Sequence, residues 1–208
     1  MKKFLSERDL LQLVKKQGKS VTIPAGSRLT PLAMDMVKSM GLYITMGDSE
    51  KPVTDTTFRE GTVAVGSDHT GFEMKKKVLE YLTKHKIPYI DVGCSGTESC
   101  DYPDFAKQVA TLIRKGKAVS GIMLDATGTP SAVVCNKVKG IVAAVCYNEF
   151  SARSARSHNN ASVICLGAKT LGEMTILSIL DIWFQVQFEG GRHQKRLDKI
   201  SLLEEEQS

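Results

Sequence analysis

The chain has 208 residues, 42% of them hydrophobic and 25% charged, so it can bury one sizeable core and carry an appendage, and it fits neither the disordered nor the fibrous class. Its formal net charge of +5 is modest, and the lysines are spread along predicted helices instead of gathering with aromatic residues, which argues against a nucleic-acid-binding protein. The longest apolar runs, such as IVAAVC, are strand-sized, which argues against a membrane span.

Residues 1–45 predict a small helical N-terminal extension. In LSERDLLQLVKKQG, Ser6 suits the N-cap of a helix and Gly18 suits its end. LTPLAMDMVKSMG repeats this pattern from Thr30 to Gly41, with a proline at the first helical position. The extension is expected to act in targeting or in oligomerisation.

The start of the chain does not read as a signal peptide. Glu7, Arg8 and Asp9 fall where a signal would be apolar, so we expect a cytoplasmic protein. The first predicted helix carries an apolar stripe, which docks on another protein, packs on the domain that follows or stabilises an oligomer. The stripe consists of Leu5, Leu10, Leu11, Leu13 and Val14.

After a polar, unpatterned linker over 46–61, residues 62–208 predict an α/β domain. Five apolar runs alternate with amphipathic ones, and the apolar runs lack the alternation of a half-exposed strand. This pattern predicts a five-stranded parallel sheet sandwiched by helices, a Rossmann-like fold. The predicted strands are TVAVG, PYIDVG, GIMLDA, IVAAVCY and SVICLGA.

Polar residues follow four of these strands. Ser67, Asp68 and His69 come after the first, Asp125 and Thr127 after the third, Tyr147 after the fourth and Lys169 after the fifth. In open α/β sheets, ligands bind beyond the carboxyl ends of the strands. The sequence therefore predicts a ligand site at this edge.

The cysteines predict neither a metal site nor disulfides. They are odd in number, lack metal-ligand spacing and lie mostly in or beside apolar runs, as buried thiols in a reducing compartment do. Cys135 falls within a helical pattern and is predicted to be a core residue. The five are Cys94, Cys100, Cys135, Cys146 and Cys165.

Four stretches carry a resemblance to a known family. GSDHTGFEMKKKVLEYL, DYPDFAKQVA, the run from NKVKG to GAKTLG and FEGGRHQKR resemble ribose-5-phosphate isomerase type B and the galactose-6-phosphate isomerase subunits. The resemblance extends from about residue 61 to the C-terminus. It implies a sugar-phosphate isomerase that works without a cofactor or metal, as a dimer or dimer of dimers with active sites shared between subunits.

The resemblance also implies roles for individual residues. His158 matches the family's ring-opening histidine, and Thr127, with the backbone N–H groups of Ala126 and Gly128, matches its oxyanion site. Lys169 stands where relatives usually carry arginine, and lysine keeps the charge but loses the planar fork. The implied phosphate contacts are Arg192, Arg196 and Lys169, and the other implied sugar-site residues are Asp68, His69, Tyr102, Asn159 and His193.

The stretch DATGTP departs from the family pattern. Most relatives read close to CGTGxG here, with the cysteine as the proton-abstracting base, whereas this chain has Asp125 at that position and Pro130 in place of the last glycine. A carboxylate is the base in unrelated triose phosphate isomerisation, so Asp125 is a candidate base. The alternative is a sugar-phosphate-binding protein, or an inactive partner subunit of a hetero-oligomer, that has lost proton abstraction.

The extension also carries a resemblance. VTIPAGSRLTPLAMDMVKSMGL resembles a short module near the N-termini of several enzymes associated with bacterial microcompartments. The resemblance implies a microcompartment shell or cargo protein as a partner of residues 1–45, and a location inside such a compartment.

Overall fold

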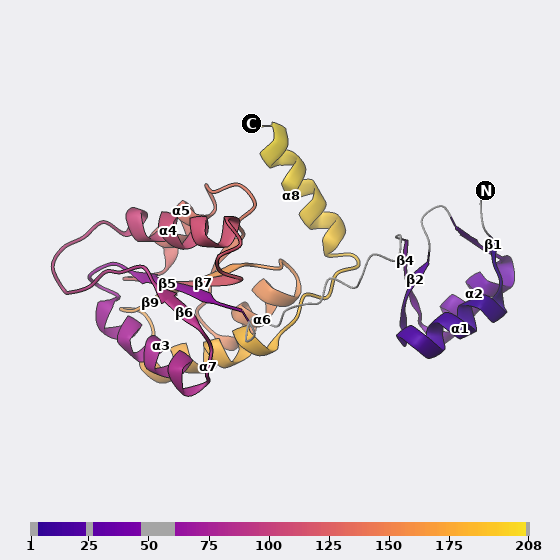
Figure 1. Ribbon diagram of the computed structural model, residues 1–208, viewed down its shortest axis with the longest axis horizontal. Helices are drawn as coiled ribbons and strands as arrows, with labels where there is room; N and C mark the ends of the chain where they lie inside the picture. Colours follow the sequence, from indigo (N-terminus) through magenta and orange to yellow (C-terminus); the bar gives the residue numbers. More distant parts are fainter. Residues whose placement is uncertain (1–3, 24–26, 47–60, 207–208) are drawn as a thin grey trace. The chain divides into compact units, whose positions relative to one another are not determined.

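The chain forms two compact units, Met1–Asp55 (unit 1) and Thr56–Ser208 (unit 2), which are shown in Figure 1. The computed structural model describes residues 4–23, 27–46 and 61–206. Almost all of the predicted linker, 46–61, lies outside these residues, so the predicted boundaries of 1–45, 46–61 and 62–208 stay a prediction.

Unit 1 contains both predicted helices. Ser6 caps α1 (Glu7–Gln17) in a capping box with Asp9, and Gly18 follows the helix with a positive φ. The second helix, α2 (Pro31–Met40), has the same arrangement, because the Thr30 hydroxyl accepts the N–H of Ala33 and a glycine in the left-handed conformation ends the helix. The predicted caps are confirmed.

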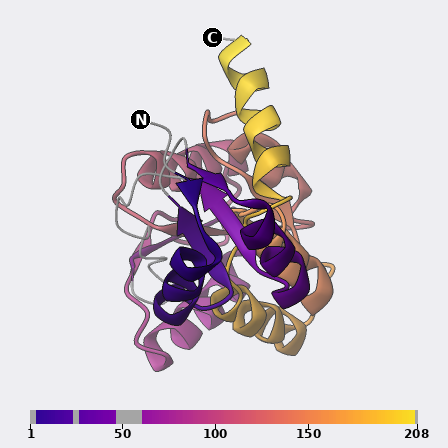
Figure 2. The same cartoon turned by 90° about the vertical axis from the view of Figure 1, so that its right-hand side faces the viewer.

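The described residues of unit 1 also form four short strands that the sequence analysis did not predict; unit 1 faces the viewer in Figure 2. In two parallel pairs, β1 (Phe4–Leu5) lies beside β3 (Arg28–Leu29), and β2 (Ser20–Ile23) beside β4 (Tyr43–Met46). The chain thus passes twice through a strand–helix–strand unit.

The apolar stripe of α1 packs largely inside unit 1. Leu5 and Leu10 are buried in its core, with Leu13 and Val14 packed against them, while Leu11 stays exposed. The stripe is therefore mainly a core element.

Unit 2 has a five-stranded parallel sheet in the order β6-β5-β7-β9-β8, which confirms the predicted fold class. Its strands are β5 (Val63–Ser67), β6 (Tyr89–Asp91), β7 (Ser120–Asp125), β8 (Ala143–Val145) and β9 (Val163–Gly167). Its helices are α3 (Phe72–Lys84), α4 (Tyr102–Arg114), α5 (Thr129–Cys135), α6 (Glu149–Ser157), α7 (Glu173–Gln185) and α8 (Gln194–Glu206).

Helices cover both faces of this sheet (Figure 1). Val63, Val65 and Leu124 point into a core with α3, α6 and α7, whereas Ala64 and Met123 point into a second core with α4 and α5. Side chains of a strand alternate between faces, so a strand covered on both faces must be apolar throughout. This explains the continuous apolar runs.

A buried ion pair ties α3 to the end of β6. The ammonium group of Lys75 is 2.6 Å from an oxygen of Asp91 and also donates to the carbonyl of Cys94, 2.7 Å away. The Lys75 side chain is only 2% exposed, and a buried charge needs such partners. The pair fixes the loop that leads toward α4.

The last helix of unit 2, α8, projects from the rest of the unit and has no buried residue (Figure 1). Among the described helices of both units, none is long and apolar enough to cross a membrane.

Candidate active site

Two neighbouring strands end in the same four-residue pattern, Asp-x-Thr-Gly. It reads DHTG from Asp68, after β5, and DATG from Asp125, after β7. The two strands are hydrogen-bonded side by side, so the two turns lie together at the carboxyl edge of the sheet.

The turn at Asp68 is held by that residue's carboxylate. One of its oxygens accepts the N–H groups of Thr70 and Gly71, at 2.8 and 3.0 Å, and the Thr70 hydroxyl at 2.6 Å. These donors lie in the turn just before α3, which begins at Phe72. Asp68, which is buried, therefore acts as the cap of this turn.

The carboxylate of Asp125 makes nearly the same contacts. Its Oδ1 accepts the N–H groups of Thr127 and Gly128, at 2.8 and 2.6 Å, and its Oδ2 accepts the N–H of Ser131 at 3.0 Å. The residue is 1% exposed. A carboxylate thus occupies the start of α5, which explains why an acidic residue sits at a place that attracts anions.

In this arrangement, backbone N–H groups of the turn donate to Asp125 and are not available to a ligand. The N–H of Gly128, which the resemblance assigns to an oxyanion, donates to Asp125, as does the N–H of Thr127. The N–H of Thr129 lies 3.3 Å from the Thr127 hydroxyl, and Pro130 has none. Thr127 and Thr129 are the exposed residues of this turn, and both carry a hydroxyl.

Three other predicted residues belong to the carboxyl edge. His69 follows Asp68, and its Nδ1 lies 3.3 Å from both the backbone N and O of Cys100. Tyr102 begins α4, shortly after this contact. Lys169 is exposed, and its backbone N–H donates to the carbonyl of Ala126, which joins the turn after β9 to the turn after β7.

No thiol among the described residues replaces Asp125 as an obvious base. Contact with Cys135 and burial raise the pKa of Cys165 well above its ordinary value, and burial raises the pKa of Cys146 to about 12. Burial likewise raises the pKa of Cys100 to about 11. Cys135 is buried in the second core, as predicted.

The other predicted residues lie at the opposite edge of the sheet. Since α6 begins after the carboxyl end of β8 and ends before the amino end of β9, His158 and Asn159 are at the amino edge. The loop from α7 to α8 meets them there, because the N–H of Glu189 donates to the carbonyl of Ser157. This loop and α8 carry Arg192, His193 and Arg196.

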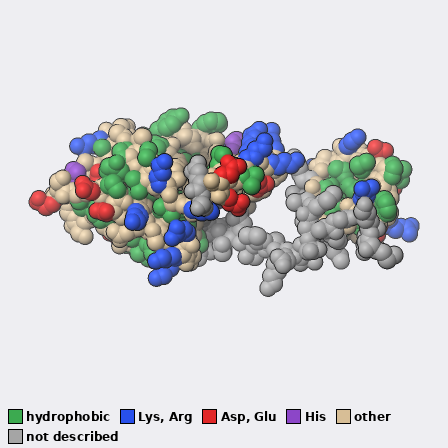
Figure 3. Space-filling model, turned by 90° about the horizontal axis from the view of Figure 1, so that it is seen from above, with side chains coloured by type: hydrophobic (Ala, Val, Ile, Leu, Met, Phe, Trp, Pro, Cys, Tyr) green, Lys and Arg blue, Asp and Glu red, His purple; other side chains and the backbone are tan. Residues whose placement is uncertain are grey.

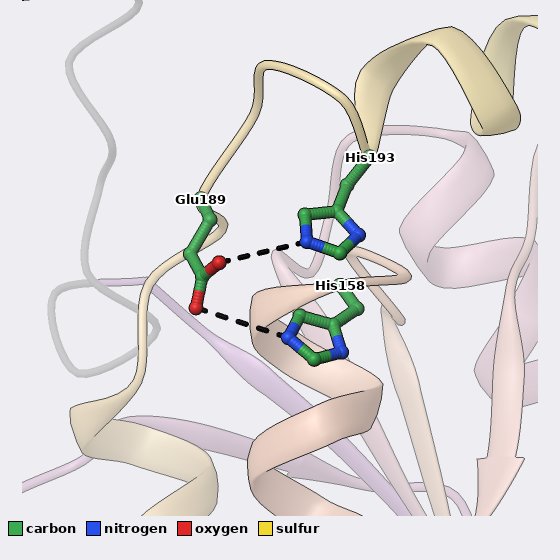
Figure 4. A group of neighbouring side chains, drawn as sticks. All are labelled: His158, Glu189 and His193. Carbon is green, nitrogen blue, oxygen red and sulfur yellow. Dashed lines mark ion pairs between the residues drawn. The ribbon is translucent and has the colours of Figure 1, made fainter.

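His158 and His193 stack at this amino edge, with Glu189 facing both of them (Figure 4). The ring centroids are 4.2 Å apart and the ring planes differ by 6°. The two carboxylate oxygens lie 3.9 Å from Nε2 of His158 and 3.6 Å from Nε2 of His193. We call these three residues the His–Glu cluster.

The His–Glu cluster is also the one group of metal-ligand type found in the described part of the chain, with ligand atoms within 4.8 Å of one another. A metal ion needs nitrogen lone pairs that converge on it at about 2 Å. In parallel stacked rings the lone pairs run parallel, so one ring would have to turn before both could bind an ion.

His193 is the buried member of the cluster, at 4% exposed. Burial lowers its pKa, and the charges of His158, Arg192 and Arg196 lower it further, against the opposite effect of Glu189. The Nε–H of Arg192 points at Nε2 of His193, 3.3 Å away, so that nitrogen is an acceptor.

Two hollows in the surface of unit 2 differ in whether predicted site residues line them. One of about 360 Å³ lies beside Asn159, between α8 and the amino ends of the strands. A larger one of about 740 Å³, lined by Ile90, Phe105 and Thr111 among others, includes none of the predicted site residues.

Seen from above, lysine and arginine side chains gather beside a histidine and several acidic groups on unit 2 (Figure 3).

Sequence reasoning gave no role to Glu189 or Ser131. Glu189 is 31 positions from His158, but its spacing of four from His193 in EGGRH was a usable signal. The repeat of DHTG in DATG was a signal for the capping role of Asp125.

Comparisons with known proteins match unit 2. Residues 63–200 match the family model described as Ribose/Galactose Isomerase. Ribose-5-phosphate isomerase B of Escherichia coli is 36% identical over 143 residues, which cover 69% of this chain and 96% of the relative. Unit 1 lies outside the region that matches the family model.

Solved structures also match unit 2. Ribose-5-phosphate isomerase B of Clostridium thermocellum superposes with a TM-score of 0.70 at 40% identity, covering 71% of this chain and 99% of that one. The Mycoplasma genitalium ribose-5-phosphate isomerase B, solved with bound ribulose-5-phosphate, gives 0.67 at 38%, covering 70% and 97%.

The lowered pKa of His193 predicts a loss of stability on acidification. An unfolded histidine titrates near 6.5, so below that pH the unfolded chain binds more protons than the folded one, and the folded state loses stability as the pH falls. In thermal unfolding between about pH 7.5 and 5.5, the Tm of the wild type should fall more than that of His193→Asn. Equal falls in Tm would contradict a lowered pKa for His193.

Proposed function

The chain belongs to the ribose/galactose isomerase family, whose members are aldose–ketose isomerases, and from this premise we propose that unit 2 interconverts an aldose phosphate and its ketose phosphate through an enediolate. Its substrate is ribose 5-phosphate or a related pentose or hexose phosphate. The proposal rests above all on the carboxyl edge, where Asp125, Thr127, His69 and Lys169 come together from neighbouring turns.

Asp125 is the proposed base. Its Oδ1 accepts two N–H groups, whereas Oδ2 accepts one. A carboxylate oxygen has two lone pairs, so Oδ2 keeps one with which to take a proton. The three backbone donors would fix the carboxylate in place, as a base that must meet a carbon-bound proton requires.

The proposed reaction moves one proton from C2 to C1 and one from the C2 oxygen to the C1 oxygen. Asp125 takes the proton from C2 of the open aldose, the electrons of the C2–H bond form the C1–C2 double bond, and the carbonyl oxygen takes up the negative charge. The Thr127 hydroxyl is the nearest proposed donor to that oxygen. Asp125 then returns the proton to C1 while the proton of the C2 hydroxyl passes to the C1 oxygen, and C2 becomes the carbonyl carbon of the ketose.

His158 is proposed to open the sugar ring, and Arg192, Arg196 and Lys169 to hold the phosphate. We place Asp68, His69, Tyr102, Asn159 and His193 around the sugar, with Ala126 and Gly128 in the turn beneath it. Arginine suits the phosphate because its planar fork pairs with two oxygens at once.

A second copy of the chain is needed to complete this site. The nine residues of α6 separate the two edges of the sheet by about 13 Å. We therefore propose a dimer in which His158 and the arginines of one protomer meet Asp125 of its partner. Ile200, Leu202 and Leu203 of α8, exposed at 45%, 55% and 56%, offer apolar surface for such an interface.

One observation favours a second candidate function. Asp125 repeats the contacts of Asp68 and is almost fully buried, as a purely structural cap would be. On this view the chain binds a sugar phosphate, or completes a hetero-oligomer, without abstracting a proton. The experiment on Asp125 separates the two.

We also propose that unit 1 directs the protein into a bacterial microcompartment by binding shell or cargo. Phe4, Leu32 and Met34 remain exposed on it at 63%, 63% and 53%. A fluorescent protein fused to residues 1–61 should concentrate in co-expressed shells of the cognate type, and a reporter that stays diffuse would remove this proposal.

Replacing Asp125 tests the proposed base. In Asp125→Asn, deuterium incorporation from D₂O into pentose and hexose phosphates should fall at least a hundredfold, while binding of inorganic phosphate stays within about twofold, because the amide cannot take the proton. NMR of the sugars and calorimetry measure the two. Undiminished exchange in Asp125→Asn would rule out Asp125 as the base.

Asp125→Cys is the matched variant. If the wild type exchanges no sugar proton but Asp125→Cys does, the second candidate function is correct.

A mixed dimer tests the shared site. One protomer carries Asp125→Asn, the other Arg196→Ala, and the two are co-purified through different tags. One of the two sites then contains only wild-type residues, so about half of the wild-type turnover should return, although each variant alone is inactive. No recovery would mean that each site lies within one protomer.

A further inference from the structure

The His–Glu cluster contains two stacked imidazole rings and one carboxylate. Glu189 holds its oxygens opposite the Nε2 atoms of both rings (Figure 4). Two positive charges in rings 4.2 Å apart would repel each other. One carboxylate can balance one such charge, so the cluster suits a single added proton.

His193 is poorly suited to carry that proton. It is the buried ring, and its Nε2 faces a hydrogen-bond donor, the Nε–H of Arg192. The charges of Arg192 and Arg196 lower its pKa in addition to the effect of burial. Its neutral ring then stacks on His158 without repelling it.

His158 is suited to carry it. Its side chain is 40% exposed, so water stabilises its charged form. Its Nδ1 lies 3.3 Å from the Ser154 hydroxyl, which orients the ring. Its Nε2 is 3.9 Å from Glu189, beyond hydrogen-bond distance, so the carboxylate attracts the charge without capturing the proton.

We propose that Glu189 is a positioning residue for ring opening, which keeps the single positive charge of the His–Glu cluster on His158. This role rests on the proposed function. In the step it serves, His158 donates its Nε2 proton to the ring oxygen as the C1–O bond breaks and its electrons go to that oxygen. The C1 hydroxyl gives its proton to water, and C1 becomes a carbonyl carbon.

A comparison of two substrates tests this role. Ribose 5-phosphate must be opened, whereas ribulose 5-phosphate has no ring, because its C5 oxygen carries the phosphate. In Glu189→Gln, turnover of ribose 5-phosphate should fall about tenfold or more, while deuterium exchange at C1 of ribulose 5-phosphate stays within about twofold. Glu189→Asp, which keeps the charge, should restore part of the turnover.

Glu80→Gln is the matched control, because Glu80 is an exposed glutamate on α3, away from both edges, and should leave both rates unchanged. Equal losses of turnover and exchange in Glu189→Gln, or no loss of either, would overturn the role of Glu189.

The charge of each ring gives a readout that needs no activity. In ¹⁵N NMR of the full chain, the single positive charge of the His–Glu cluster should be found on His158, and His193 should be neutral with an unprotonated Nε2. In Glu189→Gln the charged fraction of His158 should fall. A charged His193, or an unchanged charge on His158 in Glu189→Gln, would overturn the inference. A wild type that turned over no sugar would count against the proposed function alone, and the NMR measurement would still test the role of Glu189.

Discussion

The carboxyl edge of unit 2 depends on two carboxylates that satisfy backbone N–H groups. Where β5 and β7 leave the sheet, the chain turns sharply toward a helix, and the N–H groups of that turn have no partner in the sheet or in the helix. An unpaired buried donor costs about 1–3 kcal/mol. Asp68 and Asp125 supply the acceptors, and the two turns that they hold carry His69 and Thr127.

This constraint sets limits on the chemistry. The N–H groups that build the turn after β7 are the donors that would otherwise meet a substrate anion, and Asp125 holds them. A substrate oxyanion therefore needs side-chain donors, or donors from a partner subunit. The separation of the predicted residues onto two edges has a similar effect, since the proposed base Asp125 lies at one edge and the proposed phosphate contacts Arg192 and Arg196 lie at the other.

The fold could be predicted from the sequence because burial on two faces leaves continuous apolar runs, and the caps of α1 and α2 have clear residue preferences. Strands β1 and β3 of unit 1 could not, because two residues each are too few to show a period. In the site, the polar residues of the carboxyl edge were predicted from the strand ends, whereas those of the amino edge came only from the resemblance. The part that Glu189 plays was not, because its contact with His158 joins segments that only the fold brings together.

The pairing of strands in unit 1 has a consequence for how that unit can be cut. The first strand–helix–strand segment supplies β1 and β2, and the second supplies β3 and β4, yet each pair takes one strand from each segment. Neither segment contains a complete strand pair, so neither segment can form a sheet by itself. A protease that removed the first segment would leave the second without a fold, and a shortened graft of either segment alone would not carry the structure of the whole.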